Sequence, residues 1–264
     1  MGEKSSTAAR PCSRPVSRRA FWLALLIYLF LRIWLGTVTG DQDSQYYQGW
    51  AYQLATTGIA AAYDNPQLDY PPLVTYIFYP IGKVYKHFLP KYRPAKLHRS
   101  RPFVLLIKTP HLVFDFLCAV LIYGLIAGRG LWGGARAGPG WGRLAALLYL
   151  YNPAVIWGSG YWGQLDSVHT FFGMAAIAAL AFQRVSFSGV LLAASGLMKP
   201  LAAPLAPVIG ASMLARNGVR AFAMGAGSGV ICALVILLPF LVTGRGWDVV
   251  ERIVRDLDSW PIPP

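Results

Sequence analysis

Residues 102–127 read PFVLLIKTPHLVFDFLCAVLIYGLIA and form a 26-residue run in which only Lys108 and Asp115 are charged. A helix that crosses a membrane needs about 20 apolar residues, so this run is long enough to span one. The whole chain agrees, because 55% of its 264 residues are hydrophobic and 13% are charged, against roughly 25% charged residues in a soluble domain. The composition excludes a soluble globule and a disordered chain, and it predicts an all-α polytopic membrane protein.

Further apolar runs lie on both sides of this one. They cover residues 20–40, 144–161, 165–183, 187–198, 201–215 and 221–243. Basic residues gather in every second connection between the runs, as the positive-inside rule expects of cytoplasmic loops. These connections hold Arg129, Arg136 and Arg143, then Arg184, then Arg216 and Arg220. The pattern predicts seven spans, with a cytoplasmic basic tail at residues 1–19 and a membrane module at residues 20–243.

This topology places residues 41–101 outside the cytoplasm as a long first outer loop. Within it, the apolar segment 72–89 is predicted to be a helix that lies along the membrane surface. The alternative, in which residues 72–89 cross the membrane, would distribute the polar motifs over both faces.

The net charge of +13 comes from 24 Lys and Arg against 11 Asp and Glu. These basic residues flank apolar runs, where they fix topology and contact the head groups of membrane lipids. No nucleic-acid-binding motif accompanies them, so nucleic acid is not expected as a partner. The three cysteines, Cys12, Cys118 and Cys232, lie in no CxxC or Cys/His cluster, which predicts neither a disulfide framework nor a zinc site.

Two acidic motifs lie in the predicted first outer loop. Asp41 and Asp43 directly follow the first span, where a carboxylate acts as a general base or an ion ligand, unless the pair is only a solvated loop start. Asp69 and Tyr70 precede Pro71 and Pro72, and consecutive prolines fix the backbone before a helix. This second pair is therefore either a helix start or part of a site.

A third motif, YWGQLDS at residues 161–167, precedes the fourth span and is followed by His169. Aromatic residues such as Trp162 are ordinary at a membrane interface, and Asp166 alone is explained as a helix cap. Gln164 and Asp166 together need polar partners, however, which predicts a polar pocket.

Three charged residues fall at membrane depth, namely Lys108, Asp115 and Lys199. Each costs at least about 2.5–3.5 kcal/mol to insert, so each is expected to face a cavity or a partner. Lys108 and Asp115 are two helical turns apart and share one helix face. They either pair with groups on neighbouring helices, or Lys108 joins Lys199 in holding an anionic phosphate. Pro200, Pro204 and Pro207 interrupt the apolar runs around Lys199, which predicts a broken helix lining an enclosed cavity.

The order of these motifs resembles that of the GT-C glycosyltransferases. The resemblance covers residues 20–260 and is closest to the mannosyltransferases of glycosylphosphatidylinositol assembly and their bacterial relatives. The segment at residues 69–73 is also similar to the dolichyl-phosphate-glucose-dependent glucosyltransferases, although residues 162–167 lack the histidine of their version. The resemblance implies a GT-C-like module of about seven spans, with helices of its first outer loop lying on the membrane. It also implies a large second outer loop after the last span, and residues 244–264 look like its start, so we expect either a truncated chain or a partner chain that supplies the rest.

The same resemblance implies an enzyme that moves a hexose, mannose or glucose, from a polyprenyl-phosphate carrier to an acceptor hydroxyl on a lipid or glycan. The reaction would occur on the extracytoplasmic face of a bacterial or archaeal plasma membrane, or on the lumenal face of the endoplasmic reticulum. It implies Asp41 as the catalytic acidic residue, with Asp43 beside it. A divalent metal at this pair is the alternative to a general base, and no other cofactor is expected.

The remaining roles follow from the chemistry of the residues. Cations are expected to hold the leaving phosphate, and they are Lys199, Lys108, Arg252 and Arg255. Polar and aromatic side chains are expected to shape the sugar pocket, and they are Asp69, Tyr70, Trp162, Gln164 and Asp166. Two other functions stay open, a membrane transporter subunit and a catalytically inactive assembly subunit or fragment. A transporter is expected to place such charges near the membrane midplane.

Overall fold

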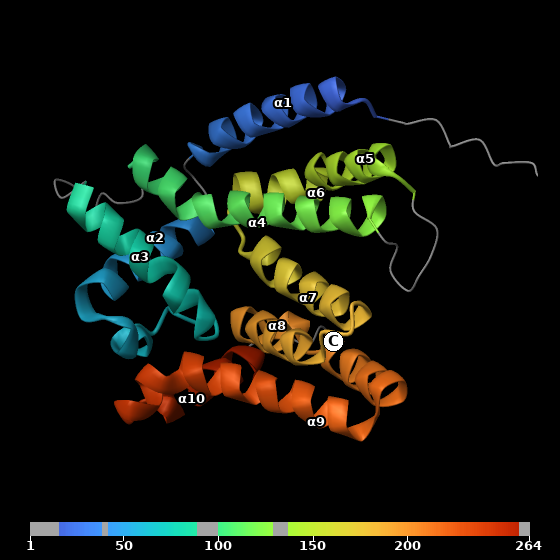
Figure 1. The fold of residues 1–264 in the computed structure, drawn as a ribbon. Coiled ribbons are helices and arrows are strands. Elements are labelled where there is room, and N and C mark those ends of the chain that lie inside the picture. Colours follow the sequence, from blue (N-terminus) through green and yellow to red (C-terminus); the bar gives the residue numbers. More distant parts are fainter. Residues whose placement is uncertain (1–15, 39–41, 89–99, 129–136, 259–264) are drawn as a thin grey trace, which may run out of the picture.

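A computed structural model describes residues 16–38, 42–88, 100–128 and 137–258, and these residues form helices without a strand (Figure 1). In chain order the elements are α1 (Arg18–Gly36), α2 (Gln42–Thr57), η1 (Ile59–Asp64), α3 (Leu73–Phe88), α4 (Arg101–Ala127), α5 (Pro139–Leu150), α6 (Pro153–Val155), η4 (Ile156–Trp162), α7 (Asp166–Ala181), α8 (Val185–Met198), η5 (Pro200–Ala202), α9 (Leu205–Val242) and α10 (Gly246–Asp258). The all-α class predicted from composition is confirmed for these residues.

Three helical stretches are long and apolar enough to cross a membrane, namely α1, α4 and the stretch Pro200–Val242 that contains η5 and α9. Helices α7 and α8 are apolar but have only 16 and 14 residues. At 1.5 Å per residue they are about 24 and 21 Å long, less than the roughly 30 Å of a hydrocarbon core. The structure is thus compatible with a membrane protein, whereas the count of seven spans is not confirmed.

The outward faces of the long helices are apolar. On α1 the exposed side chains include Trp22, Leu26 and Phe30, and on α9 they include Ile231 and Val235. Contiguous exposed apolar surface of this kind is typical of protein that contacts lipid or another protein.

One predicted span and one long helix are interrupted by identifiable residues. The run 144–161 does not form one helix, because α5 ends at Leu150 and the Asn152 side chain then accepts a hydrogen bond from the backbone N–H of Ala154. Pro153 follows this cap at the first position of the next helix, where its missing N–H costs nothing. Helix α9 breaks at Gly218, whose φ of +80° favours glycine. As predicted, the chain also breaks at Lys199, between α8 and η5.

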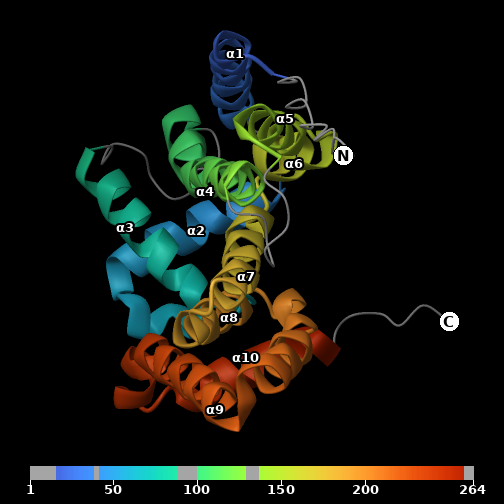
Figure 2. The same ribbon diagram turned by 45° about the vertical axis from the view of Figure 1, so that its right-hand side comes forward.

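Helices α2, η1 and α3 form a layer over one end of the long helices (Figures 1 and 2). Residues 72–89 do include the predicted helix, and α3 buries Val74, Phe78 and Tyr85 on one face. A Cβ on Gly82 would lie 1.8 Å from the carbonyl oxygen of Ala51, so glycine is needed where α3 crosses α2. Whether α3 lies along a membrane surface stays a prediction.

The largest buried cluster lies between this layer and the ends of the long helices. Its members come from most of the chain and include Tyr47, Trp50, Leu54, Tyr63, Leu68, Phe78, Phe103, Leu165, Met198, Phe240 and Val249. Leu165 and Met198 each immediately precede a polar residue singled out in the sequence, Asp166 and Lys199. Burial of this cluster therefore fixes the position of the predicted site.

Candidate functional site

Asp166 and Lys199 form the centre of the candidate site. Asp166 is the first residue of α7, and Lys199 lies in the extended break between α8 and η5. Lys199 Nζ is 2.5 Å from Asp166 Oδ1, and His169 Nε2 is 3.8 Å from the same oxygen. The side chains of Lys199 and Asp166 keep 26% and 45% of their surface exposed, so the ion pair is accessible from outside the protein.

Asp43 and Gln164 join α2 to the same region. Asp43 lies in the first turn of α2, and its Oδ2 accepts a hydrogen bond of 3.4 Å from Gln164 Nε2. Gln164 is two residues before Asp166, so this contact brings a carboxylate of the predicted catalytic motif towards the ion pair. Asp41 lies outside the described residues.

Tyr70 completes the cluster from the segment that precedes α3. Its ring centroid lies 5.9 Å from Lys199 Nζ, and its hydroxyl is 3.2 Å from the hydroxyl of Tyr47. The ring also packs at 5.6 Å from Trp50, while the backbone carbonyl of Tyr70 accepts a hydrogen bond from Tyr63. These contacts hold an aromatic face beside a cation, an arrangement that suits a sugar ring with an attached phosphate.

The charges in the cluster support one another. Burial by itself lowers the pKa of Lys199. The effects of Tyr70, Asp166 and Asp43 are larger together, so the pKa of Lys199 is raised above its ordinary value. Burial also raises the pKa of Tyr47. It raises the pKa of Tyr70 as well, although Lys199 acts to lower it. At neutral pH the site therefore holds a charged lysine beside two neutral phenols.

Lys108 contacts the backbone of two neighbouring segments. It is buried in α4, and its Nζ donates to the carbonyl oxygens of Val38, Gly160 and Tyr161 at 3.3, 3.3 and 2.7 Å. An ammonium group has three donors, so these contacts tie the end of α1 and η4 to α4. Of the two roles predicted for Lys108, the structure shows the pairing with neighbouring segments. The other role, binding a phosphate together with Lys199, stays a prediction.

Asp115 forms a further buried polar contact of α4. Its Oδ2 lies 2.7 Å from Arg32 Nη2 and accepts a hydrogen bond of 2.6 Å from Ser159. Arg32 also donates to the carbonyl of Ile156 at 3.4 Å. A Cβ on Gly160 would lie 2.2 Å from Arg32 Nη1, so glycine there makes room for the arginine. This network joins α1, α4 and η4 and does not contact the Lys199 cluster.

The other predicted site residues are Asp69, Arg252, Trp162 and Arg255. Asp69 is exposed. Both Asp69 and Arg252 lie close enough to the buried Tyr63 to affect the pKa of its hydroxyl. Arg252 donates to the carbonyl of Pro66 at 2.6 Å, which ties α10 to the segment after η1. Trp162 ends η4 and keeps 43% of its surface exposed. The side chain of Arg255 lies outside the described part of the chain.

Sequence reasoning missed Tyr47, Trp50 and the Arg245–Asp64 ion pair at 3.1 Å. Tyr47 is four residues after Asp43 and thus on the same face of α2, a signal that could have been used. Trp50 carries the same signal, because it lies three residues after Tyr47 and seven after Asp43, whereas Arg245 carries no comparable signal in sequence spacing.

No group of three His, Cys, Asp or Glu side chains suited to a metal ion occurs among the described residues, which do not include Asp41. Comparison with known proteins adds no assignment, because no protein-family model matches the chain and no curated protein is significantly similar to it. The candidate site therefore rests on its own geometry, in which Asp43, Tyr70, Gln164, Asp166 and Lys199 come together from four segments.

Proposed function

We propose that this protein is a membrane glycosyltransferase of GT-C type. It transfers a hexose, mannose or glucose, from a polyprenyl phosphate to an acceptor hydroxyl outside the cytoplasm. The observation that carries the proposal is the half-exposed Lys199–Asp166 ion pair, with the Tyr70 ring beside the lysine and the Gln164–Asp43 contact close in sequence to Asp166. A cation, carboxylates and an aromatic face are what a phosphate-linked pyranose requires.

Lys199 is the proposed ligand of the donor phosphate. When the bond between the sugar C1 and the phosphate oxygen breaks, the phosphate takes the electron pair and its negative charge grows. Lys199 is held by Asp166 before the reaction begins, and preorganised charge of this kind stabilises the developing anion. Its raised pKa keeps the ammonium charged at neutral pH.

Asp41 is the proposed general base, with Asp43 orienting it or the acceptor. The acceptor oxygen forms its new bond to C1 as its proton passes to the carboxylate, so that one proton and one leaving phosphate balance the transfer. The amide of Gln164 donates to Asp43, and this contact holds the Asp43 carboxylate near Asp166. A divalent cation at the pair is the alternative assignment.

The proposed enzyme crosses the membrane seven times, with the site on the outer side. The basic residues that gather in every second connection between the apolar runs support this number. The grouping of the site residues at the helix ends favours an enzyme over a transporter, whose ion sites lie near the midplane.

The topology predicts where introduced cysteines react with an impermeant thiol reagent. In a background without Cys12, Cys118 and Cys232, Gln45→Cys and Thr243→Cys are both expected to react from the extracytoplasmic side, because α2 and the end of α9 are assigned there. Arg220→Cys is the matched control and is expected to react after permeabilisation only. Reaction of the first two from opposite faces would contradict both the seven spans and the composite site.

Replacement of Lys199 tests the proposed function by measuring donor binding, without an acceptor. Lys199→Met is expected to weaken binding of mannosyl- or glucosyl-polyprenyl phosphate by roughly 10- to 150-fold, as loss of a hydrogen bond to a charged group does. Lys199→Arg keeps part of the affinity because it keeps the charge. Binding is measured with radiolabelled donor and the purified chain in nanodiscs.

Lys86→Met, on the exposed face of α3, is the matched control and should bind donor as the wild type does. Equal affinity of wild type and Lys199→Met would make Lys199 a structural residue. Failure of the wild type to bind either donor would overturn the proposed function itself.

A further inference from the structure

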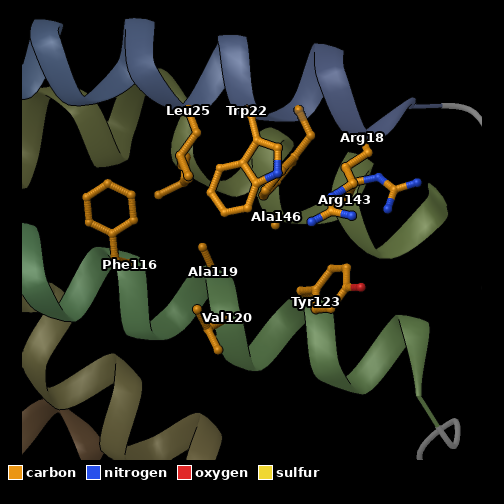
Figure 3. A pocket seen from close by; sticks show the side chains of 11 residues that line it. Arg18, Trp22, Leu25, Phe116, Ala119, Val120, Tyr123, Arg143 and Ala146 are labelled. Atoms are coloured by element: carbon orange, nitrogen blue, oxygen red, sulfur yellow. The ribbon is translucent and has the colours of Figure 1, made fainter. Parts of the chain in front are cut away.

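A second site lies at the opposite end of the helices from the Lys199 cluster. A pocket of about 340 Å³ opens between α1, α4 and α5 (Figure 3). Its volume falls at the lower end of the roughly 300–1,000 Å³ of small-molecule sites. Its walls include Phe21, Trp22 and Leu25 from α1, Phe116, Val120 and Tyr123 from α4, and Leu150 from α5.

The pocket arises because α5 packs closely on α4 while α1 stands above both. A Cβ on Gly142 would lie 2.7 Å from the Cβ of Ala127, so glycine permits the close approach of the two helices. Ala119 and Ala146 form a floor of small side chains, which leaves space below the large residues of α1. The exposed surface of Trp22, 52% of its total, places one wall at the apolar outer face of α1.

The two ends of the pocket differ in chemistry. Figure 3 shows Arg18 and Arg143 together at one end, and Leu25 and Phe116 towards the other. Arg143 Nε donates to the carbonyl of Val16 at 3.0 Å, which orients its guanidinium group. Among the described residues, no carboxylate forms an ion pair with either arginine. Two positive charges therefore border an apolar pocket without a neutralising side chain from the described chain.

We propose that this pocket binds an anionic membrane phospholipid. The headgroup phosphate lies against Arg18 and Arg143, because guanidinium groups bind phosphate oxygens in pairs. One acyl chain fills the apolar part, which a soluble phosphate compound would leave unfilled. The predicted topology puts this end in the cytoplasmic leaflet, where anionic lipids are abundant. The lipid assignment itself depends neither on that topology nor on the glycosyltransferase proposal.

Trp22 provides the readout for the test. The purified chain is placed in phosphatidylcholine nanodiscs that contain increasing fractions of phosphatidylglycerol with brominated acyl chains, which quench nearby indole fluorescence. The difference between wild type and Trp22→Phe isolates the Trp22 signal. We expect quenching of the Trp22 fluorescence to saturate at a low fraction of brominated phosphatidylglycerol. With brominated phosphatidylcholine, quenching is expected to increase only in proportion to the fraction of that lipid.

Changes at both ends of the pocket distinguish a specific site from general lipid contact. Arg18→Gln with Arg143→Gln is expected to lower the apparent affinity for phosphatidylglycerol about tenfold or more, and the exposed Arg18→Gln alone provides the test if the double variant does not fold. In Ala146→Phe, which keeps Arg18 and Arg143, quenching of Trp22 by phosphatidylglycerol should no longer saturate. Arg220→Gln, an exposed arginine outside the pocket, is the matched control and should have no effect.

Three results would overturn the proposal. Equal quenching by the two brominated lipids would mean that the arginines select no charge. Unchanged affinity in the arginine variants would mean that the phosphate lies elsewhere. Absence of quenching by either lipid would mean that protein, such as another part of this chain or a second copy, covers the pocket.

Discussion

Asp41→Asn is expected to lower turnover by about 10²–10⁴-fold with little change in donor binding. General-base catalysis contributes an effect of this size, and asparagine keeps the shape of the side chain while losing its basicity. Asp43→Asn is expected to cost less, because Asp43 is proposed to orient Asp41 or the acceptor. The measurement is transfer of radiolabelled hexose from polyprenyl phosphate into a membrane lipid extract, with donor binding measured in parallel.

Asp248→Asn is the matched control, since this carboxylate is exposed in the first turn of α10. Its turnover should equal that of the wild type. A larger loss in Asp43→Asn than in Asp41→Asn would exchange the two proposed roles. Near-complete loss in both variants, restored by added divalent metal, would replace the general base by a metal site.

Asp115→Asn is expected to destabilise the fold by about 3–5 kcal/mol, because it removes one partner of a buried ion pair and leaves the other charge unpaired. Arg32 is the residue left behind, since its Nη2 lies 2.7 Å from the carboxylate and both side chains are almost fully buried. The measurement is the free energy of unfolding in reversible denaturation of the detergent-solubilised chain.

The double variant Arg32→Met with Asp115→Leu separates two contributions to the loss of stability, the cost of an unpaired buried charge and the cost of lost packing. It is expected to be more stable than Asp115→Asn, because apolar residues of similar size replace buried ion pairs at little cost. Lys83→Met, exposed on α3, is the surface control. A double variant less stable than Asp115→Asn would show that the unpaired charge of Arg32 is not the main cost of that substitution.

The sequence predicted local features well because they depend on neighbouring residues. The break at Lys199-Pro200 and the helix within residues 72–89 both follow from proline and apolar patterns. Hydropathy did not give the helix lengths, however, since an apolar run does not show where a cap such as Asn152 ends a helix.

Partners that are distant in the chain were harder to predict. The two-turn spacing puts Lys108 and Asp115 on one face of α4, but it does not say which segment covers that face. Lys108 contacts backbone carbonyls, a partner that side-chain patterns do not encode. Asp115 contacts Arg32, which lies 83 residues earlier. In the candidate site, likewise, the ion pair of Asp166 and Lys199 depends on how α7 and α8 pack.

The layer formed by α2, η1 and α3 has a consequence for the order of biosynthesis. Its residues leave the ribosome early, yet the cluster that buries them includes Phe240 and Val249, and Asp64 pairs with Arg245. This layer must therefore wait until residues 240–249 have been translated before its apolar side chains are covered. Until then, Tyr63 and Leu68 are exposed to membrane chaperones and quality-control proteases.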